Sequence, residues 1–267
     1  MSKFSDKNPY LLLWLLLAVA LVVFIIISFR EESVSIGNLT LKQGTFKDQL
    51  MKEPDTTDVM EIDTVPLQTE KPVEPDSTIK SILVIGDSNT VLVAHRLAYY
   101  GIQNGYKVTA VTWDGSSSSA WSKTDKFDEG MAAANPDFIF ISLGGNECKG
   151  DPSNRMQFVK KLVERFGDIP FVWLGPGGHI STPEFDAAME KTLPKNTYFY
   201  HNMQLELKKD HIHPTIDGAK VWIDSVMRWM PKSAHPILSE VPDSSIKSAP
   251  FHHIYYNVKE KRQEVNP

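Results

Sequence analysis

The stretch 81–90, SILVIGDSNT, decides the fold: an apolar run stops at Gly86, and Ser88 follows two residues later. A continuous run rich in β-branched residues, ended by a glycine and followed by apolar residues at helical spacing, is typical of a buried parallel strand that leads into a helix. Ser88 would then lie at the carboxyl end of the strand, where ligands bind in open α/β sheets and where the first N–H groups of the helix are unpaired. The stretch therefore predicts a serine nucleophile at the tip of a strand.

The same alternation of strands and helices continues to about residue 230. Strands are expected at 82–85, 108–111, 138–143, 171–174 and 198–200, and helices at 91–103, 126–134, 153–166, 182–191 and about 215–229. Because crossovers between parallel strands are right-handed, five strands separated by helices imply helices on both faces of one sheet. We predict a three-layer α/β/α sandwich with a five-stranded parallel, flavodoxin-like sheet over residues 79–232.

Composition and charge narrow the class of protein. The chain has 267 residues, of which 42% are hydrophobic and 23% are charged, as in an ordinary folded protein. The formal net charge is -5, the sequence pI is about 5.9, and lysine and arginine do not gather into a dense stripe, so we expect no nucleic acid among the partners. Cys148 is the only cysteine, which excludes an intrachain disulfide.

An uncharged apolar run at 10–29 predicts a single transmembrane helix, because about 20 such residues are needed to cross a bilayer. Lysines precede this run within residues 1–9, whereas two glutamates follow directly after Arg30. This favours a cytoplasmic N-terminus and places the remaining chain outside the cytoplasm, in the periplasm or the extracellular space. A cleaved signal peptide is the alternative, but no small-residue cleavage site follows the run.

Two segments flank the predicted catalytic domain. Residues 30–78 are rich in acids, threonine and proline, which predicts a flexible linker, although 34–36 and 39–41 could form a short hairpin. Residues 233–267 form a polar, proline-rich C-terminal tail without the pattern of a second domain. An aromatic patch at 251–256 in this tail could either dock against the sandwich or meet a partner.

Four short motifs follow predicted strands or precede the last helix. They are Gly86-Asp87-Ser88, Gly115, Gly144-Gly145-Asn146-Glu147 and Asp210-His211-Ile212-His213. Together and in this order they resemble the conserved blocks of the SGNH subgroup of the GDSL-type serine hydrolases, over roughly residues 79–230. The resemblance implies ester hydrolysis or acyl transfer without a cofactor. The chain departs from the family pattern at Glu147, where aspartate is usual, and at Asn89, where leucine is usual.

The chemistry of acyl transfer explains why these residue types are needed. A serine hydroxyl is a weak nucleophile until a base removes its proton, and that base is best held by a third group. Ser88 is the predicted nucleophile, His213 the base and Asp210 the residue that orients it. The tetrahedral intermediate also needs donors to its oxyanion, and the candidates are the N–H groups of Ser88 and Gly115 and the side-chain amide of Asn146.

Simpler interpretations compete at several of these positions. Ser88 could be only the N-cap of the helix that follows it, and Gly115 could belong to a plain flexible loop. Asp210, His211 and His213 offer three potential metal ligands, but no second cluster of such residues follows a predicted strand, so we expect no metal.

Three further residues are candidates for substrate contact. Asn89 follows the nucleophile and His179 follows the fourth strand. Trp113 and Trp121 flank the loop that contains Gly115, where they could stack on a sugar ring. Asp87 is expected to brace the turn. For His179 a solvated loop position, and for Trp113 simple packing, are the alternatives.

The sequence thus predicts a membrane-anchored serine esterase that cleaves small acyl esters, in particular O-acetyl groups, from an acylated glycan of the envelope or the extracellular space. A glycan O-acetyltransferase with the same triad is the main alternative, and a catalytically idle glycan-binding module is another. The sequence leaves the acyl chain, the acceptor alcohol and the oligomeric state open.

Overall fold

The computed structural model describes residues 16–17, 34–36, 39–41 and 73–258, which belong to two compact units, Met1–Gln68 and Thr69–Pro267. In the first unit, β1 (Val34–Ile36) pairs antiparallel with β2 (Leu39–Leu41), so the short hairpin expected in the linker is present. The predicted membrane anchor at 10–29 lies outside the described residues apart from two helical residues, 16 and 17. No helix within the described part of the chain is long and apolar enough to cross a membrane.

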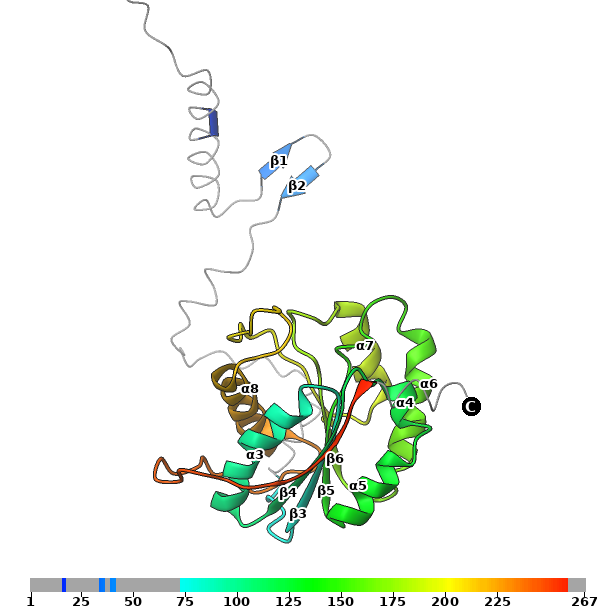
Figure 1. Ribbon diagram of the computed structural model, residues 1–267. Coiled ribbons are helices and arrows are strands. Elements are labelled where there is room, and N and C mark those ends of the chain that lie inside the picture. The colour runs from blue at the N-terminus through cyan, green and yellow to red at the C-terminus, as the bar shows by residue number, and fades with distance from the viewer. Residues whose placement is uncertain (1–15, 18–33, 37–38, 42–72, 259–267) are drawn as a thin grey trace, which may run out of the picture. The chain divides into compact units, whose positions relative to one another are not determined.

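The second unit is built on one parallel sheet (Figure 1). Its strands are β3 (Ser81–Gly86), β4 (Lys107–Trp113), β5 (Phe138–Ser142), β6 (Phe171–Leu174), β7 (Tyr198–Phe199) and β8 (His252–Tyr256). Their order across the sheet is β7-β6-β5-β3-β4-β8, and every neighbouring pair is parallel. The five expected strands are all present, in the flavodoxin-like order.

The number of strands was predicted wrongly, because the C-terminal segment supplies a sixth. The aromatic patch of this segment docks on the sandwich as β8, which pairs with β4 from Thr109 opposite His252 to Trp113 opposite Tyr256. Aromatic residues suit such a half-buried edge position. The segment expected as a separate tail is thus in part a strand of the central sheet.

Helices cover both faces of the sheet. One face carries α3 (Thr90–Asn104) and α8 (Ile216–Trp229), and α8 continues into the 3₁₀ turn η1 (Met230–Lys232). The other face carries α4 (Ser118–Trp121), α5 (Lys126–Ala134), α6 (Ser153–Glu164) and α7 (Pro183–Thr192). This arrangement is the predicted three-layer α/β/α sandwich.

The continuous apolar run of β3 reflects burial on both faces. Ile82 and Val84 belong to the core beneath α3 and α8, whereas Leu83 and Ile85 belong to the core on the opposite face. All four are fully buried, and burying one such side chain contributes about 1.5–3 kcal/mol. A strand with one solvated face would instead have shown alternating polar residues.

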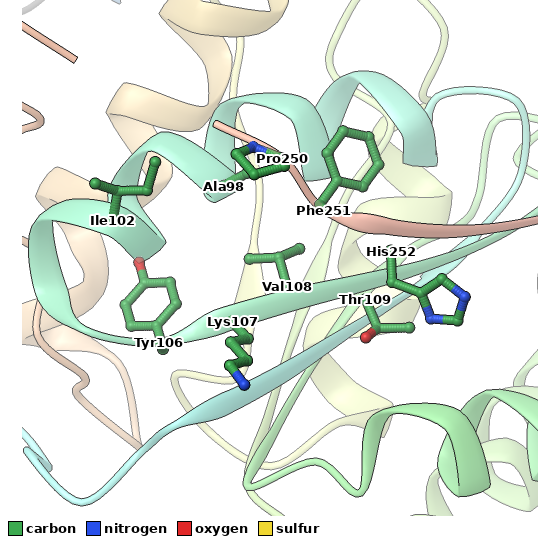
Figure 2. Close-up of a pocket in the computed structure, with 9 residues that line it drawn as sticks. All are labelled: Ala98, Ile102, Tyr106, Lys107, Val108, Thr109, Pro250, Phe251 and His252. Atoms are coloured by element: carbon green, nitrogen blue, oxygen red, sulfur yellow. The ribbon is translucent and has the colours of Figure 1, made fainter. Parts of the chain in front are cut away.

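The chain reaches β8 by way of an extended segment that crosses α3. Asn104 fixes this segment, because its side chain donates to the carbonyl of Glu240 and accepts from the N–H of the same residue, each over 2.9 Å. At the start of β8, Pro250 and Phe251 lie against α3 above Val108, beside a hollow of about 410 Å³ (Figure 2). Packing at this end of β8 is therefore incomplete.

Candidate active site

Ser88 and His213 meet at the carboxyl edge of the sheet although 125 residues separate them in sequence. Ser88 Oγ lies 2.7 Å from His213 Nε2, and His213 Nδ1 lies 2.9 Å from Asp210 Oδ2. Helix α3 begins at Thr90 with Asn89 at its N-cap position, so Ser88 is not the helix cap that the alternative interpretation proposed. Its hydroxyl is turned toward the imidazole.

The loop that carries His213 is closed by Asp210 itself. Asp210 Oδ1 accepts hydrogen bonds from the N–H groups of Ile212 and His213, each over 2.9 Å, which forms the tight turn expected from their spacing. His211, between Asp210 and Ile212, has a φ of 56°, in the left-handed region, and its side chain is exposed. The turn therefore points the side chains of His211 and His213 in different directions, and of the two only His213 contacts Ser88.

The charge of Asp210 selects the tautomer of the His213 ring. The N–H groups of His213 and Ile212, together with the His213 ring, hold the pKa of the Asp210 carboxyl well below its usual range. Asp210 is therefore an anion throughout the range in which histidine titrates. An anion beside Nδ1 favours the tautomer that carries its proton there, which leaves the lone pair of Nε2 free to accept the Ser88 proton.

His179 also reaches this loop. Its Nε2 atom lies 3.1 Å from the carbonyl oxygen of Ile212, and its ring is exposed. The structure thus places His179 at the same sheet edge as the triad, on the loop after β6, as expected. Its contact with a substrate stays a prediction.

Two of the three candidate oxyanion donors, Gly115 and Asn146, lie on neighbouring loops. Gly115 follows β4 with a φ of 64°, and Asn146 follows β5 with an exposed side chain. The Asn146 amide nitrogen donates to the carbonyl of Ser116 over 3.1 Å and to the Asp87 carboxylate over 3.3 Å. The amide thus connects the loop after β4 to the turn that carries Ser88.

Asp87 braces the nucleophile turn, as expected. It is buried, its carboxylate accepts from the N–H of Asn89 over 3.0 Å, and its own N–H donates to the carbonyl of Ser142 on β5. Burial raises the pKa of Asp87 to about 7, against the opposing effect of the Asn89 N–H. The carboxyl therefore changes its protonation state near neutral pH.

Replacing Asp87 with asparagine should change how stability depends on pH. The wild-type carboxyl keeps its proton up to a pKa of about 7 when folded but loses it near 3.8 when unfolded, so its contribution is fully present below pH 4 and is lost as the pH rises through 7. The free energy of unfolding of Asp87→Asn minus that of the wild type should therefore increase between pH 4 and 8, by about 4 kcal/mol. Urea titrations across this range measure the difference, and a constant difference would refute the assignment.

Glu147 has a role that the sequence analysis missed. This buried carboxylate accepts from the N–H of Ser118 over 2.9 Å and from its hydroxyl over 2.7 Å. It thereby ties the loop after β5 to the start of α4, across the loop that contains Gly115. The run of serines at 116–119 was the available signal, but only the fold brings it to Glu147.

Two predicted substrate contacts are wrong. Trp113 is 1% exposed and packs edge-to-face against Trp121, which is also fully buried, so neither ring can stack on a sugar. The reason is strand parity, because Trp113 lies on the same face of β4 as Val111, beneath the helices. Asn89 is 7% exposed and supports the turn through its N–H bond to Asp87, so it offers no surface to a substrate.

Metal-binding residues do not gather in the described part of the chain. There, no group of three or more His, Cys, Asp and Glu side chains has the arrangement of a metal site. Asp210 and His213 instead form the hydrogen-bonded pair beside Ser88.

Comparisons with known proteins give structural matches alone. No protein-family model and no curated protein sequence matches the chain. Similar solved structures include the psychrotrophic esterase EstA from Pseudoalteromonas sp., at 17% identity and a TM-score of 0.43 over 57% of this chain and 97% of that one.

Two further solved structures are similar at comparable levels. One is a two-domain esterase active on acetylated mannans, with 13% identity and a TM-score of 0.46 over 61% of this chain and 52% of that chain. The other is a proposed lipolytic protein of the G-D-S-L family from Desulfitobacterium hafniense DCB-2, with 17% identity and a TM-score of 0.40 over 55% of this chain and 97% of that one.

Proposed function

We propose that the chain is a serine esterase of the SGNH type that forms an acyl-serine intermediate on Ser88. The observation that carries this proposal is the hydrogen-bonded series Ser88 Oγ, His213 and Asp210, with distances of 2.7 and 2.9 Å. A hydroxyl, a base and an orienting anion in this order match the geometry of nucleophilic acyl transfer. The function rests on this site and not on the fold, which serves many chemistries.

The reaction follows from the positions of the protons. His213 Nε2 takes the proton from Ser88 Oγ as that oxygen bonds to the ester carbonyl carbon. The tetrahedral intermediate then expels the alcohol, which receives the proton from Nε2, and leaves an acyl ester on Ser88. Water repeats the sequence: Nε2 takes its proton, its oxygen bonds to the acyl carbon, and Ser88 Oγ leaves with the proton returned.

The negative oxygen of the intermediate needs donors at this edge. We assign them to the N–H groups of Ser88 and Gly115 and to the Asn146 amide. The Asn146 amide nitrogen holds the Asp87 carboxylate at 3.3 Å, the longer of its two bonds, so this is the one that an oxyanion would replace.

Replacing Asn146 with alanine should lower kcat by about 10²- to 10³-fold while changing KM little, since the donor acts mainly in the transition state. Initial rates on an aryl acetate over a range of concentrations measure both constants. Gln157→Ala, an exposed amide on α6, is the matched control, because its side chain donates only to a carbonyl of its own helix. A rise in KM at unchanged kcat would assign Asn146 to ground-state binding instead.

We propose that the natural substrate is a small acyl ester, in particular an O-acetyl group, on a glycan of the envelope or extracellular space. The exposed side chains of Asn146 and His179 beside Ser88 support an open site that a polymer can reach. The expected location outside the cytoplasm supports the same substrate class. That location depends on residues 10–29, which we propose as a membrane anchor, with 30–78 as the linker to the catalytic unit.

Cell fractionation tests the anchor. The full-length chain should sediment with membranes and resist extraction by high salt, and proteolysis within 30–78 should release an active soluble fragment. A mature protein that begins near Arg30 would contradict the anchor.

Transfer to a glycan hydroxyl in place of water is the alternative function of the same triad. Incubating the full-length chain with an aryl acetate, with and without candidate glycans, separates the two by where the acetyl group ends. Free acetate in both reactions supports the esterase, and acetylated glycan supports the transferase. A glycan-binding module without catalysis would leave the aryl acetate intact.

A further inference from the structure

The loop that carries Gly115 is held from outside by the C-terminal strand. The N–H of Asp114 donates to the carbonyl of Tyr256 over 3.1 Å, and the Tyr255 hydroxyl donates to Asp114 Oδ2 over 2.6 Å. Beyond the strand, Val258 Cγ2 lies 3.6 Å from where a Cβ would be on Gly115. We propose that β8 positions the oxyanion-hole loop, with Tyr255 and Asp114 as positioning residues for the esterase reaction, an inference that rests on the proposed function.

The geometry of the turn explains how this contact acts on the site. Residues 113–116 form a β-turn closed by the Ser116 N–H on the Trp113 carbonyl, 3.1 Å apart, with Gly115 in the left-handed region. The Gly115 N–H belongs to the peptide group that joins Asp114 to Gly115. Bonds to the N–H and the carboxylate of Asp114 hold this residue on one side of that peptide group, and the bond from Ser116 to Trp113 closes the turn on the other side. Together they restrict the direction of the donor.

The same loop also holds the second candidate donor. The carbonyl of Ser116 accepts from the Asn146 amide, so a shift of the turn would move Asn146 as well. On its inner side the loop is held by Glu147, through its two bonds to Ser118. On its outer side the contacts come from β8. The site therefore depends on a strand more than a hundred residues distant in sequence.

The strand itself is firmly attached near the site. Lys126 of α5 lies over two rings, 4.5 Å from the centre of Tyr256 and 5.1 Å from that of Trp113, and the Tyr256 hydroxyl bonds to Glu129. His253 Nε2 lies 3.0 Å from Thr112 Oγ1. The hollow beside Phe251 lies at the opposite end of the strand (Figure 2), so the close contacts gather at the end that meets the loop.

Tyr255 is suited to a test because its role in folding is small. It is 54% exposed, so its hydroxyl contributes little to the core, while its partner Asp114 sits next to Gly115. Removing an oxyanion donor outright costs about 10²- to 10³-fold in kcat. A donor that stays in place but is held less firmly in direction should lower kcat by less. We expect a fall in kcat of about tenfold for Tyr255→Phe.

The experiment compares full-length variants on an aryl acetate and on an aryl phosphonate. The phosphonate bonds to Ser88 Oγ with loss of the phenolate, and leaves a charged oxygen in the oxyanion hole. Tyr255→Phe should lower kcat and the rate of phosphonylation together at unchanged KM. Asp114→Ala should do the same, and the double variant should be no worse than the more severe of the two, because the pair acts as one unit. Tyr99→Phe on α3 is the matched control, since its hydroxyl bonds to the carbonyl of Lys247 before the start of β8, away from the loop, and it should keep the wild-type kcat.

The outcomes separate the two proposals. Unchanged kcat and phosphonylation in Tyr255→Phe would overturn the positioning role, and so would losses that Tyr99→Phe shows equally, in parallel with its melting temperature. A wild-type protein that cleaves no ester, or that cleaves it as well after Ser88→Ala, would instead refute the proposed function.

Discussion

Ser88→Ala is expected to lower kcat on an aryl acetate by about 10⁴-fold or more while leaving the fold intact, since the triad acts as a unit and the remaining rate comes from the oxyanion hole and binding. Ser88 Oγ is the atom that His213 contacts at 2.7 Å, and alanine removes that atom alone. Because Ser88 is not the helix cap, α3 should form as before. The measurement is the steady-state rate, corrected for spontaneous hydrolysis.

The control for this prediction is a serine that lies away from the site. Ser225→Ala on α8 removes a hydroxyl that bonds to a carbonyl of its own helix, and it should keep full activity. Circular dichroism and thermal melting should show the same fold for both variants. A folded Ser88→Ala protein with near-normal activity would exclude the mechanism.

The two histidines of the turn should differ in effect by several orders of magnitude. His213→Ala removes the base and should lower kcat by about 10⁴-fold or more. His211→Asn should retain most activity, because its side chain is exposed and asparagine tolerates the left-handed φ of 56° at this position. The same kinetic assay measures both, at equal protein concentration.

A metal site would give the opposite result. If Asp210, His211 and His213 held a metal ion, both histidine substitutions would cost activity equally, and chelators would inhibit the wild type. Unequal losses without inhibition by a chelator support the acid–base role of His213 alone.

Much of the site was predictable because parallel strands bring their carboxyl ends to one edge. The run 81–90 placed Ser88 at the tip of β3, and the spacing of Asp210 and His213 allowed the carboxylate to fold back onto the imidazole. Side-chain type and spacing along the chain were sufficient for these three residues. The strand order also followed, since right-handed crossovers allow few alternatives.

The sequence was insufficient where a role depends on distant packing. The segment 252–256 has the aromatic residues of a strand, but it follows an irregular stretch, so nothing local showed that it pairs with β4. Trp113 was predicted to contact the substrate because it flanks a glycine loop. It is two residues from Val111 and therefore lies on the same face of the strand, and helices cover that face. The role of Glu147 could be recognised only from the position of Ser118 in three dimensions.

The most direct test of the central claim is to identify the residue that carries the acyl group during turnover. The full-length chain is mixed with an aryl acetate, quenched in acid within the first turnovers, digested and analysed by mass spectrometry. We predict one acetyl group per chain on the peptide that contains Ser88, absent from Ser88→Ala and accumulating faster than it is released. Turnover of the ester with the acetyl group on another residue, or with no acylated peptide and an unaffected Ser88→Ala variant, would contradict the account.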